Sequence, residues 1–210
     1  MAAQPARSIE GMRSPGARRA QLVSAAARLF SERGYHGTSM RHLGEAMGVL
    51  RGSLYAHIGS KQELLFDVVD HGADRFLERG EQAITLDGDA AERLEAFLVW
   101  HVETAIEHIE AATVFLSEWR YLDDELRAII RAKRDRYEAM ARGIIADGIR
   151  EGVFREDVDV HMAARLVLSA GNWVYTWYRP GGGLTPTEIG EVFADMIVRG
   201  FQKEGAGGNQ

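Results

Sequence analysis

Residues 38–61 read TSMRHLGEAMGVLRGSLYAHIGSK, and this stretch decides the fold of the N-terminal part of the chain. Apolar residues recur at three- and four-residue spacing in its first part, which predicts a short helix over residues 39–47. The hydroxyl of Thr38 is expected to cap the first turn of this helix. Gly48 should end it, because glycine adopts a positive φ without strain.

A second short helix is predicted over residues 51–57, with Leu54 and Ile58 on its buried side. Ser60 and Glu63 then have the spacing of a capping box at the start of a longer helix. Two short helices around a glycine turn are typical of a helix-turn-helix motif, whose second helix enters the major groove of DNA.

Length and composition narrow the class of protein. The chain has 210 residues and no cysteine, so it can bury one or two stable cores without disulfides or thiolate metal sites. No apolar run approaches the ~20 residues that span a bilayer. The arginines near the start are not followed closely by the apolar segment of a signal peptide. We therefore expect a cytoplasmic protein with no membrane segment.

Charge is distributed unevenly along the chain. Residues 1–61 carry nine Lys or Arg and three Asp or Glu, a net charge of +6, whereas the whole chain carries −6. The remainder therefore carries −12. A basic N-terminal part favours DNA binding, because neutralising phosphates supplies much of the affinity. An ordinary solvated bias is the alternative, and the coincidence with a helix-turn-helix motif weighs against it.

The remaining sequence is expected to be helical, with no alternation that indicates strands. Capping residues, glycines and prolines separate its segments. The predicted helices cover residues 16–33 and 61–84, a segment after residue 89, residues 109–120, a segment from 123 or 124 to about 151, a segment after 159 to about 177, and residues 186–201.

These elements predict an all-α protein with two folded domains. A disordered arm over residues 1–14 precedes an N-terminal three-helix helix-turn-helix domain over residues 15–60. A C-terminal helical domain for ligand binding and dimerisation is expected over residues 61–204, followed by a disordered tail over residues 205–210.

The segment AARLFSERGYHGTSMRHLGEAMGVLRGSLYAHIGSKQELL, residues 26–65, strongly resembles the N-terminal domain of the TetR family of transcriptional regulators. The resemblance extends over about residues 18–66, and it departs from the family at Ile58 and Gly59, where phenylalanine is more usual. The positions in register are Phe30, Gly34, Thr38, Ser39, Leu43, Met47, Gly48, Val49, Gly52, Leu54, Tyr55, His57, Ser60 and Lys61.

Candidate DNA contacts combine this resemblance with side-chain chemistry. The resemblance implies phosphate contacts by Tyr55 and His57, and a helix N-terminus at Thr38 can bind a phosphate. Arginines that reach base edges can bind guanine with two hydrogen bonds. A core position is the alternative for Tyr55, but it lies opposite Leu54. The predicted DNA-binding residues are Thr38, Ser39, Arg41, Arg51, Gly52, Ser53, Tyr55, His57 and Lys61.

All four tryptophans lie in the C-terminal part of the chain. Aromatic helices around a cavity with few polar groups are typical of a site for a hydrophobic ligand. The alternative is that each tryptophan belongs to the core or to a subunit interface. The predicted ligand-binding residues are Trp100, His101, Phe115, Trp119, Arg120, Arg134, Tyr137, Asn172, Trp173 and Trp177.

The last two predicted helices are apolar over more than one face, as expected of helices that form both core and interface. The family resemblance implies a four-helix contact with a second copy of the chain. Such a symmetric homodimer predicts a palindromic operator in double-stranded DNA. The predicted interface residues are Val167, Ala170, Gly171, Val174, Tyr178, Phe193, Ile197 and Phe201.

The segment NWVYTWYRPGGGLTPTEIGEVFADMIVRGF, residues 172–201, resembles the end of a TetR branch whose members commonly sense acyl-coenzyme A thioesters in lipid or steroid breakdown. That resemblance implies an acyl chain in the aromatic cavity and arginines on the phosphates of the coenzyme. Arg120, Arg134 and Arg179 are candidates, with ordinary solvated arginines as the alternative.

Catalysis is not indicated, because the chain contains no Walker loop and no HExxH, GxSxG or GxGxxG motif. His101 and His108 are two helical turns apart, which argues against a metal site. We predict no catalytic residue, metal or cofactor.

The expected function is that of a repressor released from its operator when a small hydrophobic effector, best represented by an acyl-coenzyme A thioester, displaces the helix over residues 61–84. The alternatives are a sensor of another hydrophobic drug or aromatic metabolite, and a helical protein-binding module.

Overall fold

The computed structural model describes residues 15–49, 54–55 and 58–203. This part of the chain is helical, and its β structure is confined to an isolated antiparallel bridge between Phe154 and Gln202, so the all-α class is confirmed. The elements are α1 (Pro15–Gly37), α2 (Met40–Met47), α4 (Lys61–Ile84), α5 (Ala90–Glu107), α6 (Ile109–Ser117), the 3-10 helix η2 (Trp119–Tyr121), α7 (Asp124–Arg150), α8 (Val160–Trp177) and α9 (Pro186–Phe201). No helix of the described part is both long and apolar enough to cross a membrane.

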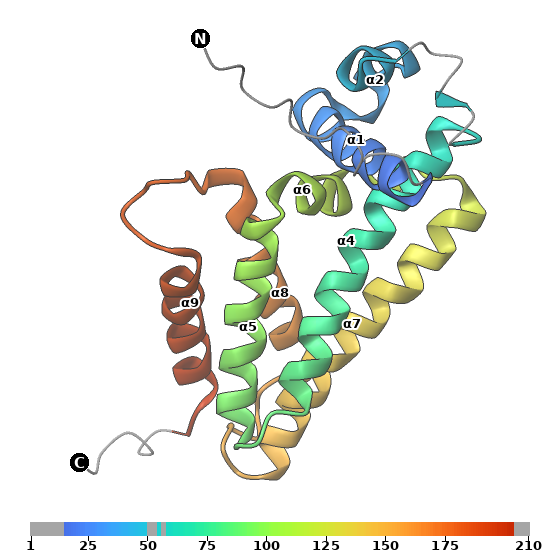
Figure 1. Cartoon of the computed structure of the whole chain (residues 1–210). Coiled ribbons are helices and arrows are strands. Elements are labelled where there is room, and N and C mark those ends of the chain that lie inside the picture. The colour runs from blue at the N-terminus through green and yellow to red at the C-terminus, as the bar shows by residue number, and fades with distance from the viewer. Residues whose placement is uncertain (1–14, 50–53, 56–57, 204–210) are drawn as a thin grey trace.

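The head of the molecule contains α1 and α2, and it lies across one end of the helical body (Figure 1). Phe30 of α1 and Leu43 of α2 are buried in its core with Leu54 and Ile58. The predicted helix over residues 16–33 continues to Gly37, but it is interrupted at Gly34, which is not helical, with φ 73° and ψ 162°. The chain therefore turns directly after the predicted helix.

The start of α2 corrects one prediction. Ser39, and not Thr38, is its N-cap: the Ser39 hydroxyl accepts a hydrogen bond from the amide of His42, and the His42 ring accepts one from the amide of Ser39. At the other end, Gly48 takes a left-handed conformation with φ 65°, as predicted.

The long helix α4 connects the head to the body (Figure 1). Its first turn is capped by Ser60, which accepts a 3.0 Å hydrogen bond from the amide of Glu63. The Glu63 carboxylate does not complete a box with Ser60, because it accepts its bond from the amide of Gly59 at 2.7 Å. The buried side of α4 packs against α1, α6, α5 and α7, so one rigid element contacts both parts.

In the body, α5 packs between α4, α8 and α9, and α9 lies along the outer side of α5 (Figure 1). Glycine allows this last contact to be close, because a Cβ on Gly190 would lie 2.7 Å from Cα of Val99. The loop after α7 is closed by Phe154, which is fully buried between α7 and α9, against Gly148 and Phe201.

The connection between α6 and α7 differs from the predicted helix over residues 109–120. The α-helix ends at Ser117, and the next residues form the tighter 3-10 turn η2, closed by a hydrogen bond from the amide of Leu122 to the carbonyl of Trp119. Asp123 then caps α7 by accepting from the amide of Leu126. This short connection places residues 118–123 at the junction of head and body.

Candidate DNA-binding and ligand-binding sites

Three of the predicted DNA contacts, Ser39, Arg41 and Tyr55, are exposed in the described head. Tyr55 is 45% exposed on the side opposite the buried Leu54 and Ile58, as the helical pattern predicted. Arg41 has a side chain that is 75% exposed and pairs with Glu45 one turn along α2. The predicted contacts Arg51, Gly52, Ser53 and His57 lie outside the described residues.

Thr38 does not present its hydroxyl to a phosphate. The residue is 1% exposed, and its hydroxyl donates to the carbonyls of Leu29, at 3.1 Å, and Gly34, at 3.0 Å. Its amide donates to the carbonyl of Tyr35 at 3.2 Å. Thr38 therefore closes the C-terminal end of α1, and the exposed residue at the start of α2 is its neighbour Ser39.

Lys61 is turned towards the head. Its ammonium group donates a 2.5 Å hydrogen bond to the carbonyl of Tyr35 and lies 3.9 Å from the centre of the Tyr35 ring. Partial burial lowers the pKa of Lys61. In this conformation the charge of Lys61 fixes α4 to the end of α1.

The same Tyr35 is held by residues 118–123. A carboxylate oxygen of Glu118 accepts a 2.6 Å hydrogen bond from the amide of Tyr35, and the Tyr121 ring stacks on the Tyr35 ring with 6.1 Å between centres. Gln62 of α4 bonds both the carbonyl of Tyr121 and the amide of Asp123. Residues 118–123 thus join α1, α4 and α7.

A small cavity of about 120 Å³ lies inside the body between α4, α5, α6, α7 and α8. It brings together half of the predicted ligand-binding residues, although they are far apart in the sequence. The predicted residues that line it are His101, Phe115, Arg134, Tyr137 and Asn172, and the others are Phe76, Leu116, Asp135, Glu138 and Leu168.

The tryptophans do not line this cavity. Trp173 and Trp177 are exposed on the outer side of α8, and Trp100 is half-buried beneath Arg79, whose guanidinium lies 5.8 Å from its ring centre. Trp119 of η2 is also half-buried, and it stacks on the guanidinium of Arg134. Arg120 is exposed. In this structure the four predicted tryptophan contacts therefore lie outside this cavity.

His101 is the most buried polar residue of the cavity wall. It is 2% exposed, and its Nδ1 lies 3.0 Å from the hydroxyl of Tyr137. Burial lowers the pKa of His101 to about 4, an effect that the nearby Asn172 amide opposes, so the ring is neutral at pH 7. Burial raises the pKa of Tyr137, so its hydroxyl keeps its proton.

Four predicted interface residues belong to the core of one chain. Val167, Val174 and Phe201 are buried, and Gly171 lies against His101, since a Cβ there would be 2.4 Å from Cδ2 of that ring. The other four, Ala170, Tyr178, Phe193 and Ile197, are half-buried. The exposed apolar residues lie at neighbouring positions of α8 and α9: Met162, Leu166, Trp173, Trp177, Val192 and Met196.

This outer face, defined by those six residues, was missed because both helices are apolar on two sides. The signal was present as a spacing of four and seven residues from Met162 to Trp177. Periodicity locates such a stripe but does not say which of two apolar stripes faces the protein's own core.

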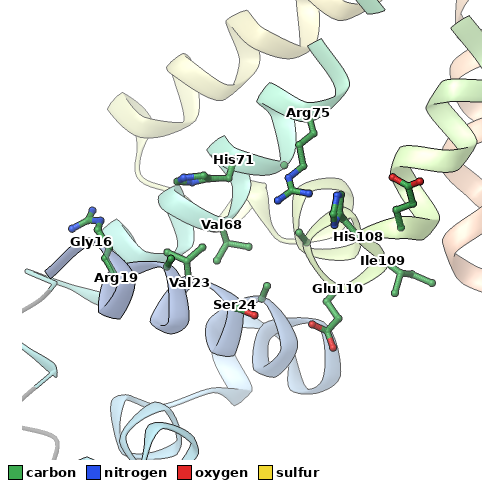
Figure 2. Close-up of a pocket in the computed structure, with 15 residues that line it drawn as sticks. Gly16, Arg19, Val23, Ser24, Val68, His71, Arg75, His108, Ile109 and Glu110 are labelled. Carbon is green, nitrogen blue, oxygen red and sulfur yellow. The ribbon is translucent and has the colours of Figure 1, made fainter. Parts of the chain in front are cut away.

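A larger cavity, of about 630 Å³, lies where the N-terminal half of α1 faces α4 and the junction of α5 and α6. Figure 2 shows Arg75 of α4 pointing towards His108, with Val23 and Ser24 of α1 across the cavity. Burial and the charge of Arg75 lower the pKa of His108. The space separates part of the head from the body, whereas residues 118–123 connect them.

The described part of the chain contains no group of three or more His, Asp or Glu side chains placed to hold a metal ion. Its described elements are a small helical head, in which the glycine turn follows α2, and a helical body with a cavity between its helices, an arrangement typical of DNA-binding regulators. Comparison with known proteins identifies the family.

A family model described as bacterial regulatory proteins of the tetR family matches residues 22–68, and one described as a tetracyclin repressor-like C-terminal domain matches residues 87–201. The chain belongs to the TetR family of bacterial transcriptional regulators.

Two curated relatives and one solved structure are informative. The transcriptional repressor KstR2 of Mycobacterium tuberculosis is 30% identical over 190 residues, which cover 90% of this chain and 94% of that protein. The fatty acid metabolism regulator protein of Bacillus subtilis is 26% identical over 88% of this chain and 95% of its own. AibR, solved in complex with isovaleryl coenzyme A and operator DNA, matches with a TM-score of 0.78 and 29% identity over 85% of this chain and 97% of AibR.

Proposed function

We propose that the chain is a homodimeric repressor that leaves a palindromic operator when an acyl-coenzyme A thioester binds its body. The observation that carries this proposal is the position of residues 118–123. Trp119 in this segment stacks on Arg134 of the cavity wall, while Glu118 holds the amide of Tyr35 in the head. A ligand that displaces Arg134 therefore acts on a segment that also fixes the head.

The outer face of α8 and α9 supports the dimer. A described surface with two exposed tryptophans and two exposed methionines is costly to leave in water, and a second copy can bury it by twofold symmetry. Two heads related by that symmetry would read two half-sites of a palindrome. The residues that we place in this interface are those of the outer face, not the buried residues first predicted.

The proposed mechanism is a shift between two arrangements of head and body. The effector must bind more tightly to the arrangement that does not fit the operator, because a ligand with equal affinity for both arrangements does not change their populations. Rearrangement of residues 118–123 would release Tyr35, and the cavity between α1 and α4 leaves room for the head to move against the body. The α4 helix, anchored by Lys61, carries the movement between the two parts.

The effector class rests on relatives and on chemistry. AibR is solved with a short acyl-coenzyme A, and two relatives are a repressor and a fatty acid metabolism regulator by name. The cavity combines apolar walls with a few polar groups, as a site for an acyl group requires. A TetR-type sensor of another hydrophobic compound is the second candidate. Because an operator-binding protein must reach the chromosome, we propose a cytoplasmic location.

The test is a titration of the purified dimer against a palindromic duplex from its own promoter region and a random duplex of equal length. We expect preference for the palindrome, a steep loss of affinity with added salt, and release by an acyl-coenzyme A. Equal affinity for both duplexes would refute the repressor. If affinity does not depend on salt concentration, the alternative of a protein-binding module is favoured. If the complex with the palindrome persists in the presence of acyl-coenzyme A, the effector is another hydrophobic compound.

A further inference from the structure

A residue of the cavity wall contains a buried polar atom without a partner: His101 Nε2 makes no hydrogen bond among the described residues. Outside the cavity, Nε1 of Trp119, whose ring stacks on Arg134, is also buried and unpaired. Leaving a buried donor or acceptor unpaired costs about 1–3 kcal/mol. Such atoms need either ordered water or a ligand.

The hydrogen bond between Tyr137 and His101 decides which ring nitrogen of the neutral His101 carries the hydrogen. If the Tyr137 hydroxyl donates to Nδ1, the phenol is satisfied and the neutral ring carries its hydrogen on Nε2. The opposite arrangement would leave the phenol hydrogen without an acceptor in the described part, and Nε2 would also remain unpaired. The first arrangement leaves fewer unpaired groups, so His101 carries an Nε2–H donor in the cavity wall, next to the side chain of Asn172.

Arg134 adds a positive charge on another wall of the same cavity. Its guanidinium lies 5.0 Å from the ring centre of Phe115 and 4.9 Å from that of Trp119, which fixes its plane between two aromatic surfaces. No ion pair of Arg134 occurs within the described residues, since Glu138 pairs with Arg142. Burial and then the charge of Arg120 lower the pKa of Arg134, and Asp135 and Glu138 oppose this. Arg134 remains charged, and its donors are available to an acceptor.

Gly171 fixes the distance between α8 and His101. The helix approaches so closely that any Cβ at this position would lie 2.9 Å from Nε2. The imidazole is therefore held between Tyr137 on one side and the backbone of α8 on the other. A donor held in this way is pre-oriented for one position of an acceptor.

We propose that the cavity selects ligands by an acceptor oxygen, either a thioester carbonyl or a carboxylate, which is bound by the Nε2–H of His101 and the guanidinium of Arg134. This inference rests on the proposed function for its site and adds which atom of the effector is recognised. A volume of about 120 Å³ admits only a short acyl segment, and the competing occupant is a group of roughly four water molecules, at about 30 Å³ each.

The experiment uses three ligands with one short branched carbon chain: the acyl-coenzyme A thioester, the S-alkyl coenzyme A thioether that lacks only the carbonyl oxygen, and the free carboxylic acid. Titration calorimetry on the full-length dimer should show at least about tenfold tighter binding of the thioester than of the thioether, which corresponds to about 1.4 kcal/mol. Tight binding of the acid alone would assign the acceptor to a carboxylate.

Equal affinity for thioester and thioether would overturn the inference while leaving an acyl-coenzyme A effector in place. Binding of the acid but of neither coenzyme A ligand would support acceptor recognition and refute the proposed effector. If none of the three binds, the cavity holds water only, and the inference fails.

Two variants assign the selectivity to residues. Tyr137→Phe removes the group that sets the hydrogen on His101, and Arg134→Met removes the charge but keeps an apolar side chain. Each should reduce the ratio of thioester to thioether affinity several-fold while thioether binding shows that the cavity is intact. Arg79→Met is the matched control, because Arg79 also lies over a tryptophan, Trp100, but does not line the cavity. An unchanged ratio in both test variants would overturn the assignment.

Discussion

The carboxylate of Glu118 accepts a 2.6 Å hydrogen bond from the backbone amide of Tyr35, two residues that are 83 positions apart in the sequence. One belongs to the segment before η2 in the body, and the other follows the turn at Gly34 in the head. A hydrogen bond from a backbone amide to an ionised carboxylate is roughly twice as strong as one between two neutral groups. This bond is therefore a direct connection between the ligand-sensing and DNA-reading parts.

Glu118→Ala should weaken the communication between the two parts. We expect a loss of about 1–2 kcal/mol in unfolding free energy, because the amide of Tyr35 loses a charged acceptor. The factor by which effector lowers operator affinity should also shrink. Operator binding with and without effector measures the factor, and urea unfolding measures stability. Glu95→Ala, at an exposed glutamate on α5, is the control; a similar effect in both variants would contradict a specific role for Glu118.

Two glycine-to-alanine substitutions should change the free energy of unfolding in opposite directions. Gly171→Ala would place a Cβ 2.4 Å from the His101 ring, so α8 or the ring must shift, at a cost of about 1–3 kcal/mol. Gly143→Ala on α7 meets nothing within 4 Å and should stabilise the helix by up to about 1 kcal/mol. Urea unfolding of both variants checks the prediction, and stabilisation by Gly171→Ala would show that the close approach is not real.

A charge on the outer face should separate the subunits. Trp173 is 65% exposed, and Trp173→Glu would bury two carboxylates if the proposed dimer formed. We expect a monomer by sedimentation and a loss of operator affinity of about 100-fold or more. Ile129→Glu, at an exposed apolar position on α7, should leave a dimer. A dimeric Trp173→Glu protein would place the interface elsewhere.

Arg41→Ala should distinguish a base contact from a phosphate contact. A lost phosphate contact weakens binding to all sequences and reduces the salt slope by about one, whereas a lost base contact mainly relaxes sequence preference. Arg199→Ala is the matched control, because Arg199 has the same 75% side-chain exposure and also pairs with a carboxylate one turn away. Titrations with specific and random duplexes at several salt concentrations measure the salt slope and the sequence preference. If Arg41→Ala changes neither, Arg41 does not contact DNA.

His101 should make the protein less stable in acid. Its pKa falls to about 4 on folding from an ordinary value near 6.5, so the unfolded chain binds more protons between these limits. Stability from this residue is therefore complete at pH 7 and decreases as the pH falls, by about 2 kcal/mol at pH 5. Urea unfolding of the wild type and of His101→Gln at pH 7 and at pH 5 isolates the contribution of His101 to the pH dependence of stability. Equal pH dependence of the two proteins would contradict a buried, neutral histidine.

Helix boundaries were the most predictable part of the structure, because they are set by local chemistry. Ser60, Asp89, Asp159 and Pro186 mark helix starts in the sequence and in the structure alike. The family resemblance was equally readable, since the glycine turn and the small helices depend on residues that are near one another. The class of protein followed from these local features.

Long-range arrangement was predicted less well. His101, Tyr137 and Asn172 were predicted to bind the ligand, but their meeting in one cavity depends on how three helices pack. Trp173 and Trp177 were placed inside, because side-chain type alone does not distinguish a ligand pocket from an apolar outer surface. The bond between Glu118 and Tyr35 has no sequence signal, since it joins an ordinary glutamate to a backbone amide.

The uneven charge of the chain can orient the molecule near DNA, because the two charged parts lie at different ends. A head with a net charge of +6 lies at one end of a body with a net charge of −12, so the protein has a large electric dipole along its length. In the field of a duplex the body is repelled and the head attracted, and the molecule turns before it touches DNA. Encounters then begin in the productive orientation, and the fraction that does so falls as salt shortens the range of the field.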